Sequence, residues 1–311
     1  MNPPIEHSAL SIAVIGIINH DTIQMANGEE LQDLGGILYN VAVLANVADA
    51  GTTIYPVSRI GRDCWDRMLH LLRPYPNVDT RGIVIAPEGT SRNSIRYDAS
   101  MEKVERLTNH IAPIPFTQVE PFVGYDALLI NFIIGDDVSL DTLRAVRARS
   151  TGLLYLDVHN LCLGIDADGY RFHHRPDDWR EWLSVVDIVQ MNEVEACLLA
   201  GRPIHTDDEF AGIGREVLAA GPAIVIVTRG RQGSVTVSRR AGADTVFVCP
   251  PEPVDRVVDT TGCGDAFAAG FLTEYLKMND PVAASRLANW TAGVNCTLAG
   301  LKEVGRFRNH R

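Results

Sequence analysis

Short apolar runs rich in valine and isoleucine recur along this chain, and they constrain its fold more than any other feature. The runs cover residues 11–16, 127–134, 153–158, 188–191 and 223–228. Continuous apolar runs of this length are typical of strands buried on both faces of a parallel sheet. Longer stretches of helical character lie between them, at residues 38–50, 64–72, 140–149, 192–200 and 207–220. This alternation predicts an α/β fold, in which helices cover both faces of a mainly parallel central sheet.

Residues that favour helix ends support this prediction. Asp141 and Asp207 lie at or near the starts of two predicted helices, where a carboxylate can accept backbone N–H groups. Gly51, Gly201 and Gly221 follow the ends of three predicted helices, where glycine readily adopts the left-handed conformation that terminates a helix. The end signals and the apolar runs therefore indicate the same arrangement.

Two segments, residues 22–35 and 92–110, interrupt the alternation. The first half of the second segment alternates in character, as a strand with one exposed face does. These segments predict extra strands or loops outside the main sheet, which would form a small β lid. The chain has no internal repeat, low-complexity tract or flexible linker, so we expect a single domain over residues 1–311 with this lid attached.

Composition limits the partners of the chain. Its 311 residues are 46% hydrophobic, which is enough to bury a substantial core. The formal net charge of -11 argues against nucleic acid or an anionic membrane surface as a partner, because both are negatively charged. A phosphorylated ligand would therefore need donors placed locally in its binding site.

The cysteines and the amino-terminal residues predict a cytoplasmic protein. Six cysteines are scattered along the chain without a CxxC pair or a zinc-site spacing. Glu6 lies where a secretory signal would carry positive charge, and the apolar run after it is short enough for a buried strand. Asn289 and Asn295 each begin an N-glycosylation pattern, which we interpret as coincidence in such a protein.

The strongest functional signal is the segment DTTGCGD, residues 259–265, which precedes a small apolar stretch at residues 266–272. The stretch predicts a buried helix, whose first N–H groups would face the Gly-Cys-Gly turn and bind an anion without lysine. Glycine in the turn would let a phosphate approach the backbone. Asp265 could accept a proton from an attacking hydroxyl group. The alternative is an ordinary helix start, in which Asp265 only favours the helix dipole.

This segment resembles the second signature of the PfkB/ribokinase family of sugar and nucleoside kinases, and further matches extend over residues 11–305. The resemblance implies a ribokinase-like fold. It also implies that Asp265 is the catalytic base and that the amides of Gly262, Cys263 and Gly264 form an anion hole. Cys263 stands where the family usually has Ala, Gly or Ser, so we interpret its role as a backbone one, with a redox-sensitive thiol as the alternative.

Other segments resemble the parts of the family that bind the phosphate acceptor. Residues 16–21 resemble the first-strand motif, whose aspartate binds substrate hydroxyls, and residues 35–36 resemble a Gly-Gly turn that precedes a substrate-facing asparagine. The predicted lid adds Arg92 and Arg96 as candidates for closing over a substrate. The implied substrate-binding residues are Asn19, Asp21, Gly35, Gly36, Asn40 and Arg96.

The resemblance extends to a nucleotide and magnesium site. Asn192 and Glu195 match an Asn-x-x-Glu element that acts on Mg²⁺ and phosphates largely through water. Asn289 falls where a side chain faces the adenine. The nucleotide loop is matched by Thr228, Gly230 and Gly233. Asp157 follows another predicted strand, where it could cap the strand end or contact metal-bound water.

A monovalent cation site is left open. Asp259, Thr261 and Gly300 match positions that hold such a cation in some members. Val304 stands where some members use a hydroxyl ligand, which weakens the match. The resemblance therefore implies ATP and Mg²⁺ as cofactors and leaves K⁺ undecided.

The leading prediction is transfer of the γ-phosphoryl group of ATP to a hydroxyl group of a sugar or sugar-like alcohol. Ile133 lies near the position where ribokinase carries a sugar-binding glutamate, which argues against ribose. A nucleoside kinase is the nearest alternative, with Phe132, Tyr39 and Tyr97 as aromatic candidates for stacking a base. A non-catalytic nucleotide-binding module is the second. We expect a small-molecule partner and, by analogy with the family's lids, a homodimer.

Overall fold

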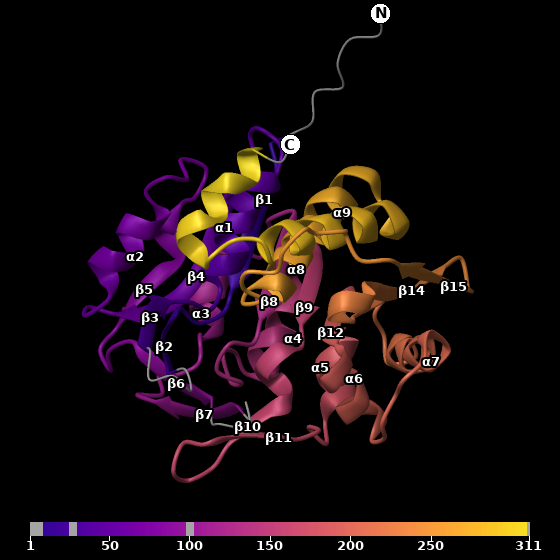
Figure 1. Cartoon of the computed structure of the whole chain (residues 1–311), viewed down its shortest axis with the longest axis horizontal. Helices are drawn as coiled ribbons and strands as arrows, with labels where there is room; N and C mark the ends of the chain where they lie inside the picture. The colour runs from indigo at the N-terminus through magenta and orange to yellow at the C-terminus, as the bar shows by residue number, and fades with distance from the viewer. Residues whose placement is uncertain (1–8, 25–29, 98–102, 310–311) are drawn as a thin grey trace, which may run out of the picture.

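The computed structural model describes residues 9–24, 30–97 and 103–309 (Figure 1). Within these residues, nine strands form the central sheet in the order β15-β14-β13-β12-β9-β8-β1-β4-β5. Neighbouring strands from β13 to β5 pair in parallel, whereas β14 and β15 are antiparallel. The strands are β1 Ser11–Ile15, β4 Thr53–Gly61, β5 Ile83–Ala86, β8 Ala127–Asn131, β9 Leu153–Asp157, β12 Ile188–Asn192, β13 Ile224–Thr228, β14 Ser234–Arg240 and β15 Ala243–Cys249.

The five apolar runs of the sequence are the strands β1, β8, β9, β12 and β13. Every residue of β8 is buried, and the other four strands are buried except at one end residue each. A strand in this position has helices on both of its faces and therefore needs an apolar side chain at nearly every position. The predicted α/β fold with a mainly parallel sheet is confirmed.

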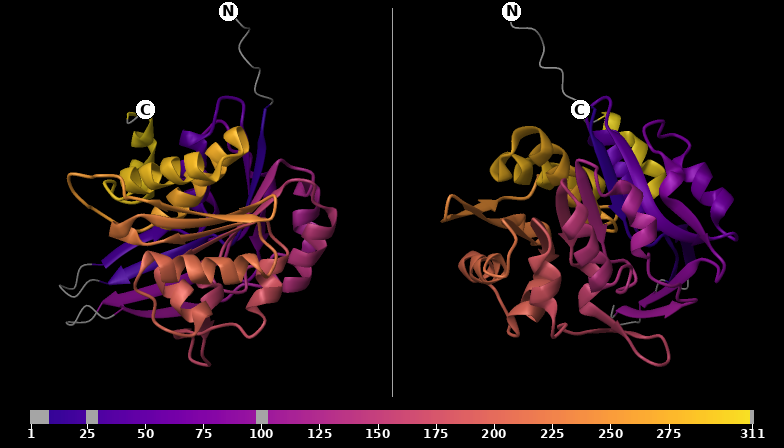
Figure 2. Two further views of the ribbon diagram at one scale, coloured as in Figure 1. Left: turned by 90° about the vertical axis from the view of Figure 1, so that its right-hand side faces the viewer. Right: turned by 180° about the vertical axis from the view of Figure 1, so that it is seen from behind.

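Helices cover both faces of the central sheet (Figure 2). Helices α1, α8 and α9 pack together on one face, and α4 to α7 lie on the other. Ser139 and Thr206 are the N-caps of α4 and α7, so Asp141 and Asp207 occupy the first turn instead. The helices are α1 Leu38–Val47, α2 Trp65–Leu72, α3 Phe116–Val119, α4 Leu140–Arg149, α5 Trp179–Ser184, α6 Glu193–Ala200, α7 Asp207–Leu218, α8 Cys263–Met278 and α9 Pro281–Asn295.

A second, small sheet stands beside the central one. In the part of the chain that the structure describes it has four strands, in the order β3-β2-β6-β7. Strands β2 and β6 pair in parallel, and each pairs with its outer neighbour in antiparallel fashion. Its strands are β2 Asn19–Gln24, β3 Glu30–Leu34, β6 Ser91–Tyr97 and β7 Lys103–Thr108. The segments predicted to leave the main sheet thus form this small sheet, with β2 starting three residues earlier than expected. A short hairpin, β10 Leu163–Ile165 and β11 Arg171–His173, lies beside β7 of the small sheet, and its turn accepts the backbone N–H of Leu107 at the carbonyl oxygen of Gly169, at 2.8 Å.

Polar residues end several of the parallel strands at the same edge of the central sheet. Asn131, Asp157, Asn192 and Thr228 are the last residues of β8, β9, β12 and β13. The carboxyl ends of parallel strands are where ligands bind in open α/β sheets, which directs attention to this edge. Among the residues that the structure describes, none of the helices is long and apolar enough to cross a lipid bilayer.

Candidate active site

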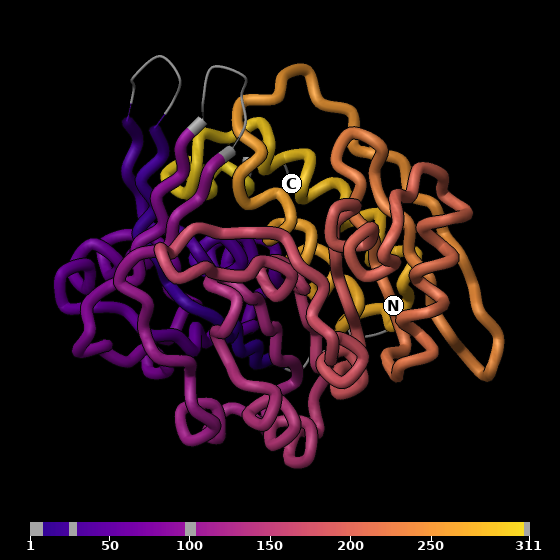
Figure 3. Tube along the Cα trace, turned by 90° about the horizontal axis from the view of Figure 1, so that it is seen from below, coloured from indigo at the N-terminus to yellow at the C-terminus, as the bar shows by residue number. Residues whose placement is uncertain are grey.

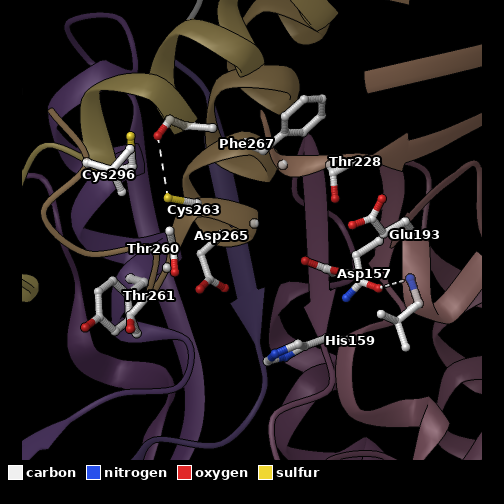
Figure 4. A pocket seen from close by; sticks show the side chains of 18 of the residues that line it. Asp157, His159, Glu193, Thr228, Thr260, Thr261, Cys263, Asp265, Phe267 and Cys296 are labelled. Carbon is white, nitrogen blue, oxygen red and sulfur yellow. Dashed lines mark hydrogen bonds between the residues drawn. The ribbon is translucent and has the colours of Figure 1, made fainter. Parts of the chain in front are cut away.

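A cavity of about 710 Å³ lies at the carboxyl ends of the parallel strands (Figure 4). At one end it is lined by residues of the small sheet, including Asp21, Ile23 and Asn93. At the other end it reaches the loop before α8 and the helix α9, at Val254 and Ala292. The first turn of α8 lines the cavity as well, with Gly264 and Asp265. The cavity therefore joins the two regions that the sequence assigned to acceptor and nucleotide.

Helix α8 begins at the predicted anion-binding turn. Gly262 is its N-cap, and no side chain caps the helix. Because a helix start without a cap leaves backbone N–H groups for a ligand, this end of α8 can bind an anion. The N–H of Cys263 already donates to the carbonyl oxygen of Thr260 at 3.2 Å. A bound anion would therefore depend most on the N–H groups that follow, at Gly264 and Asp265.

The two glycines of the turn are needed for different reasons. Gly262 has a φ of 75°, and a Cβ atom there would lie 2.3 Å from Cδ1 of Tyr39. At Gly264 a Cβ atom would meet its nearest neighbour, Nε2 of Gln190, at 3.8 Å. Gly262 is thus required by the backbone and by Tyr39, whereas the space at Gly264 is open to a ligand.

Asp265 is held by two asparagines. Asn131 donates from Nδ2 to Oδ1 of Asp265 at 2.6 Å, and Asn40 donates to the backbone oxygen of Asp265 at 3.2 Å. Asn131 also donates to Oδ1 of Asn40 at 2.9 Å. Burial raises the pKa of Asp265 to about 7, against the smaller opposing effect of these hydrogen bonds. A carboxyl group with this pKa is suited to accept a proton near neutral pH.

Asn131 was not identified from the sequence. It is the one polar residue within the apolar run at residues 127–134, and it is the last residue of β8, at the strand end that faces the site. The sequence therefore contained a signal that could have identified Asn131. Asn40, which the resemblance made a substrate-facing residue, is fully buried and does not line the cavity; its side chain bonds to Asn131 and Asp265 instead.

Two carboxylates lie on the wall opposite Asp265, where Figure 4 shows the buried Asp157 and the exposed Glu193 beside Thr228. Gln190 donates from Nε2 to Oδ2 of Asp157 at 2.8 Å and to the backbone oxygen of Gly264 at 3.0 Å, linking the two walls. Burial, and then the nearby carboxylates of Glu195 and Asp265, raise the pKa of Asp157 well above its ordinary value.

Positive charge is scarce around this cavity. Arg231 is the one arginine among its lining residues, and no lysine joins it in the part of the chain that the structure describes. Asp157, Glu193 and Asp265 all line the same space. A polyphosphate would be repelled by these carboxylates unless a divalent cation accompanied it. Oxygen ligands suited to Mg²⁺ are available at Asp157 and Glu193.

Glu195 has a different position from the one its predicted role requires. Its carboxylate accepts the backbone N–H of Asn192 at 2.8 Å and the side-chain amide of Asn192 at 2.6 Å, which completes a capping box at the start of α6. Glu195 is buried and does not line the cavity. Asn192 and Glu193 do line it. Because Asn192 is the N-cap, Glu193 is the first residue of the helix. Recognition of this cap in the sequence could therefore have identified Glu193.

The acceptor end of the cavity is built around Asn19. Asn19 donates from Nδ2 to Oδ1 of Asp21 at 2.8 Å, and its own Oδ1 is buried without a hydrogen-bond partner among the described residues. A Cβ atom at Gly35 would lie 2.3 Å from Oδ2 of Asp21, and one at Gly36 would lie 2.1 Å from the backbone oxygen of Ile17. Glycine at both positions is therefore what allows this turn to pack against the polar pair.

The two predicted lid arginines do not line the cavity. Ile95 lines it, and the exposed side chain of Arg96 follows directly in the strand, where consecutive side chains point to opposite faces. Arg92 donates to Oδ2 of Asp63 at 2.8 Å. Asn93, Ile23 and Ile95 line this end of the cavity and were not identified from the sequence.

The predicted nucleotide residues Asn192, Thr228, Gly230, Gly233 and Asn289 all line the cavity. Asn289 is held by donating from Nδ2 to Oγ of Ser234 at 2.8 Å. Its neighbourhood is apolar: the cavity is lined there by Val254, Phe267 and Ala292. An apolar slot of this kind suits a planar base.

The residues proposed to bind a monovalent cation do not all line the cavity. Thr261 lines the cavity, whereas Asp259 and Gly300 do not.

Burial raises the pKa of the Cys263 thiol to about 12, so this thiol stays protonated at neutral pH.

The fold is shared with ribokinases. The ribokinase of Arabidopsis thaliana, solved with ribose and ATP, superposes with a TM-score of 0.74, covering 97% of this chain and 99% of its own at 19% identity. Residues 167–304 of this chain match the model of the pfkB family of carbohydrate kinases. This part of the chain is therefore similar to the PfkB family, and the resemblance seen in the sequence is confirmed there.

Two curated relatives are similar over most of their length. A cytidine kinase of Thermococcus kodakarensis is 27% identical over 86% of this chain and 89% of its own. A fructokinase of Klebsiella pneumoniae is 28% identical over 84% of this chain and 83% of its own. Both relatives are kinases, one named for a nucleoside and one for a sugar.

Proposed function

We propose that this protein transfers the γ-phosphoryl group of ATP to a hydroxyl group of a sugar or sugar-like alcohol. The observation that carries the proposal is the position of Asp265. Its carboxyl group has a pKa of about 7, is aligned by Asn131, and lies in the first turn of an uncapped helix. A base for the acceptor and an anion site for the transferred group are thereby next to each other.

In the proposed reaction Asp265 accepts the proton of the acceptor hydroxyl as its oxygen attacks phosphorus. The N–H groups at the start of α8 stabilise the charge on the transferring group. Asp157 and Glu193 would hold Mg²⁺, in part through water, and Glu195 supports this wall by fixing Asn192. Bound Mg²⁺ would neutralise phosphate charge. The apolar slot at Phe267 and Ala292 would take the adenine.

The acceptor end supports a sugar-like alcohol over a nucleoside. Asn19, Asp21 and Asn93 offer hydrogen bonds to hydroxyl groups there. Phe132 is fully buried, with its ring centre 5.4 Å from that of Trp182, and cannot stack a base. Tyr39 lines the cavity, with its ring against Gly262. The side chain of Tyr97 lies outside the described residues. A nucleoside acceptor is the second candidate, favoured by the similarity to the cytidine kinase.

The test is an assay of the phosphorylated product with a panel of sugars, polyols and nucleosides as acceptors. We expect ATP with Mg²⁺ to support turnover of at least one hydroxylated acceptor, and full chelation of Mg²⁺ to abolish it. Inorganic pyrophosphate is a control donor, because it would leave the apolar slot empty. Preference for a nucleoside would select the second candidate. Turnover that survives chelation would refute Mg²⁺-dependent phosphoryl transfer. ATP binding without turnover of any acceptor would refute the proposal and favour a binding module.

The pH dependence of the rate gives a separate prediction. Below its pKa of about 7, Asp265 is protonated and cannot accept a proton, so kcat/KM of the wild type should rise with pH up to about 7 and then level off. Replacing Asn131 with alanine removes a donor that favours the charged carboxylate. The acid limb of the profile should therefore move to higher pH in Asn131→Ala. An unmoved or lowered limb would mean that another group controls it.

A further inference from the structure

The turn before α8 is fixed by the end of α9. The backbone N–H groups of Val258 and Asp259 donate to the carbonyl oxygen of Cys296, at 2.8 and 3.2 Å. The side chain of Asn295, the last residue of α9, donates from Nδ2 to the carbonyl oxygen of Thr261 at 2.9 Å. Only 3% of Asn295 is exposed, so water competes little for this bond.

Asn295 contacts the residues on both sides of Gly262. The same Nδ2 atom lies 3.5 Å from Sγ of Cys263, the first residue of α8. Thr261 and Cys263 flank Gly262, whose φ of 75° makes the turn possible. One buried amide group therefore holds the two residues that set the direction of the first N–H groups of α8.

A monovalent cation does not fit these surroundings. Such an ion needs several oxygen ligands, and one lone pair of the carbonyl oxygen of Thr261 is already taken by a side-chain N–H. Oδ1 of Asp259 accepts the backbone N–H of Thr261 at 2.9 Å. Val304 is fully buried, and its side chain offers no ligand atom. The partial positive charge of the amide of Asn295 would also repel a cation beside Thr261.

We infer that the side chain of Asn295 fixes the anion-binding turn by itself, and that phosphoryl transfer by this protein needs no monovalent cation. This inference rests on the proposed function. Asn295 is a positioning residue: it acts through Thr261 and Cys263 and is not among the residues lining the cavity.

The first experiment compares the wild-type rate in KCl, NaCl and tetramethylammonium chloride at equal ionic strength. The tetramethylammonium ion is too large to occupy a site between protein oxygens. We expect kcat to agree within about twofold among the three salts. Activation by K⁺ of more than about fivefold over tetramethylammonium would overturn the inference.

The second experiment uses Asn295→Asp, which keeps the shape of the side chain and replaces its N–H group by a carboxylate oxygen facing Thr261. In tetramethylammonium chloride we expect kcat to fall at least about tenfold because the turn shifts, while ATP affinity changes less than about threefold. Asn46→Asp is the matched control: Asn46 is also a buried amide that donates to a backbone oxygen, that of Ala42 at 2.8 Å, and it does not line the cavity. The control should lose stability and keep kcat. A wild-type kcat in Asn295→Asp would remove the assigned role.

The two proposals can fail separately. If the wild type turns over no acceptor in any salt, the proposed function has failed. The affinity of the wild type for ATP, measured by calorimetry in KCl and in tetramethylammonium chloride, then decides the cation question. Equal affinities support the inference, and tighter binding in KCl contradicts it.

Discussion

Replacing Asp265 with asparagine should lower kcat by at least about a hundredfold, the usual size of the effect when a general base is lost. Asparagine has the same shape but cannot take the proton of the acceptor. ATP should bind as well as before or slightly better, since the change removes a negative charge near the phosphates. Steady-state kinetics and calorimetric titration with ATP would check the two expectations.

A measurement of stability distinguishes loss of the general base in Asp265→Asn from misfolding of the variant. Burial raises the folded-state pKa of Asp265, so the contribution of this group to stability is fully present at low pH and is lost as the pH rises through about 7. Asp265→Asn should therefore be at least as stable as the wild type above this pH. Asp141→Asn is a matched control, because Asp141 also lies in the first turn of a helix, away from the cavity. A normal rate in Asp265→Asn would show that another group is the base.

The second large effect is expected from Gly262→Ala. Alanine at this position must adopt a left-handed backbone conformation, and its methyl group would clash with the ring of Tyr39. Together the left-handed conformation and the clash should lower the free energy of unfolding by about 2–4 kcal/mol. Because the turn must move to relieve the clash, kcat should fall at least about a hundredfold in the remaining folded protein. Urea denaturation and the rate assay measure the two effects.

Gly264→Ala is the comparison for this variant. The space around Gly264 is open and its φ is ordinary, so the alanine variant should unfold at nearly the wild-type urea concentration. Its methyl group would instead obstruct an approaching phosphate and raise KM for ATP. If both variants lost stability equally, the different reasons given for the two glycines would be wrong.

The sequence predicted the centre of the fold better than its edges. Strands such as β8 are buried on both faces, so burial alone requires an apolar run. Strand β4 was missed because it contains Pro56, Ser58 and Arg59, although it pairs with β1 on one side and β5 on the other. Strand β15 is mostly exposed at the edge of the sheet and needs no apolar run.

For the site, the sequence identified residues whose positions follow from the backbone. Gly262, Gly264 and Asp265 lie together because they share one turn and one helix start. Asn131, Gln190 and Asn295 come from β8, β12 and α9, and they meet this turn only through the tertiary fold. Spacing along the chain carries no information on such contacts. Glu195 was identified by a motif match, which carries no information on the direction of a side chain.

The residues that line the two ends of the cavity come from different parts of the chain. Its small-sheet residues lie between Asn19 and Glu105, whereas its lining from Asn192 onward comes from β12, α6, β13, α8, α9 and their loops. Figure 3 shows these early and late parts of the chain on different sides of the molecule. The family match at residues 167–304 covers the late part alone. The two stretches also interlock, because Asn40 donates to the backbone oxygen of Asp265 and Tyr39 lies against Gly262. An exchange of the early stretch between relatives would therefore have to keep Tyr39 and Asn40 if the turn before α8 is to stay in place.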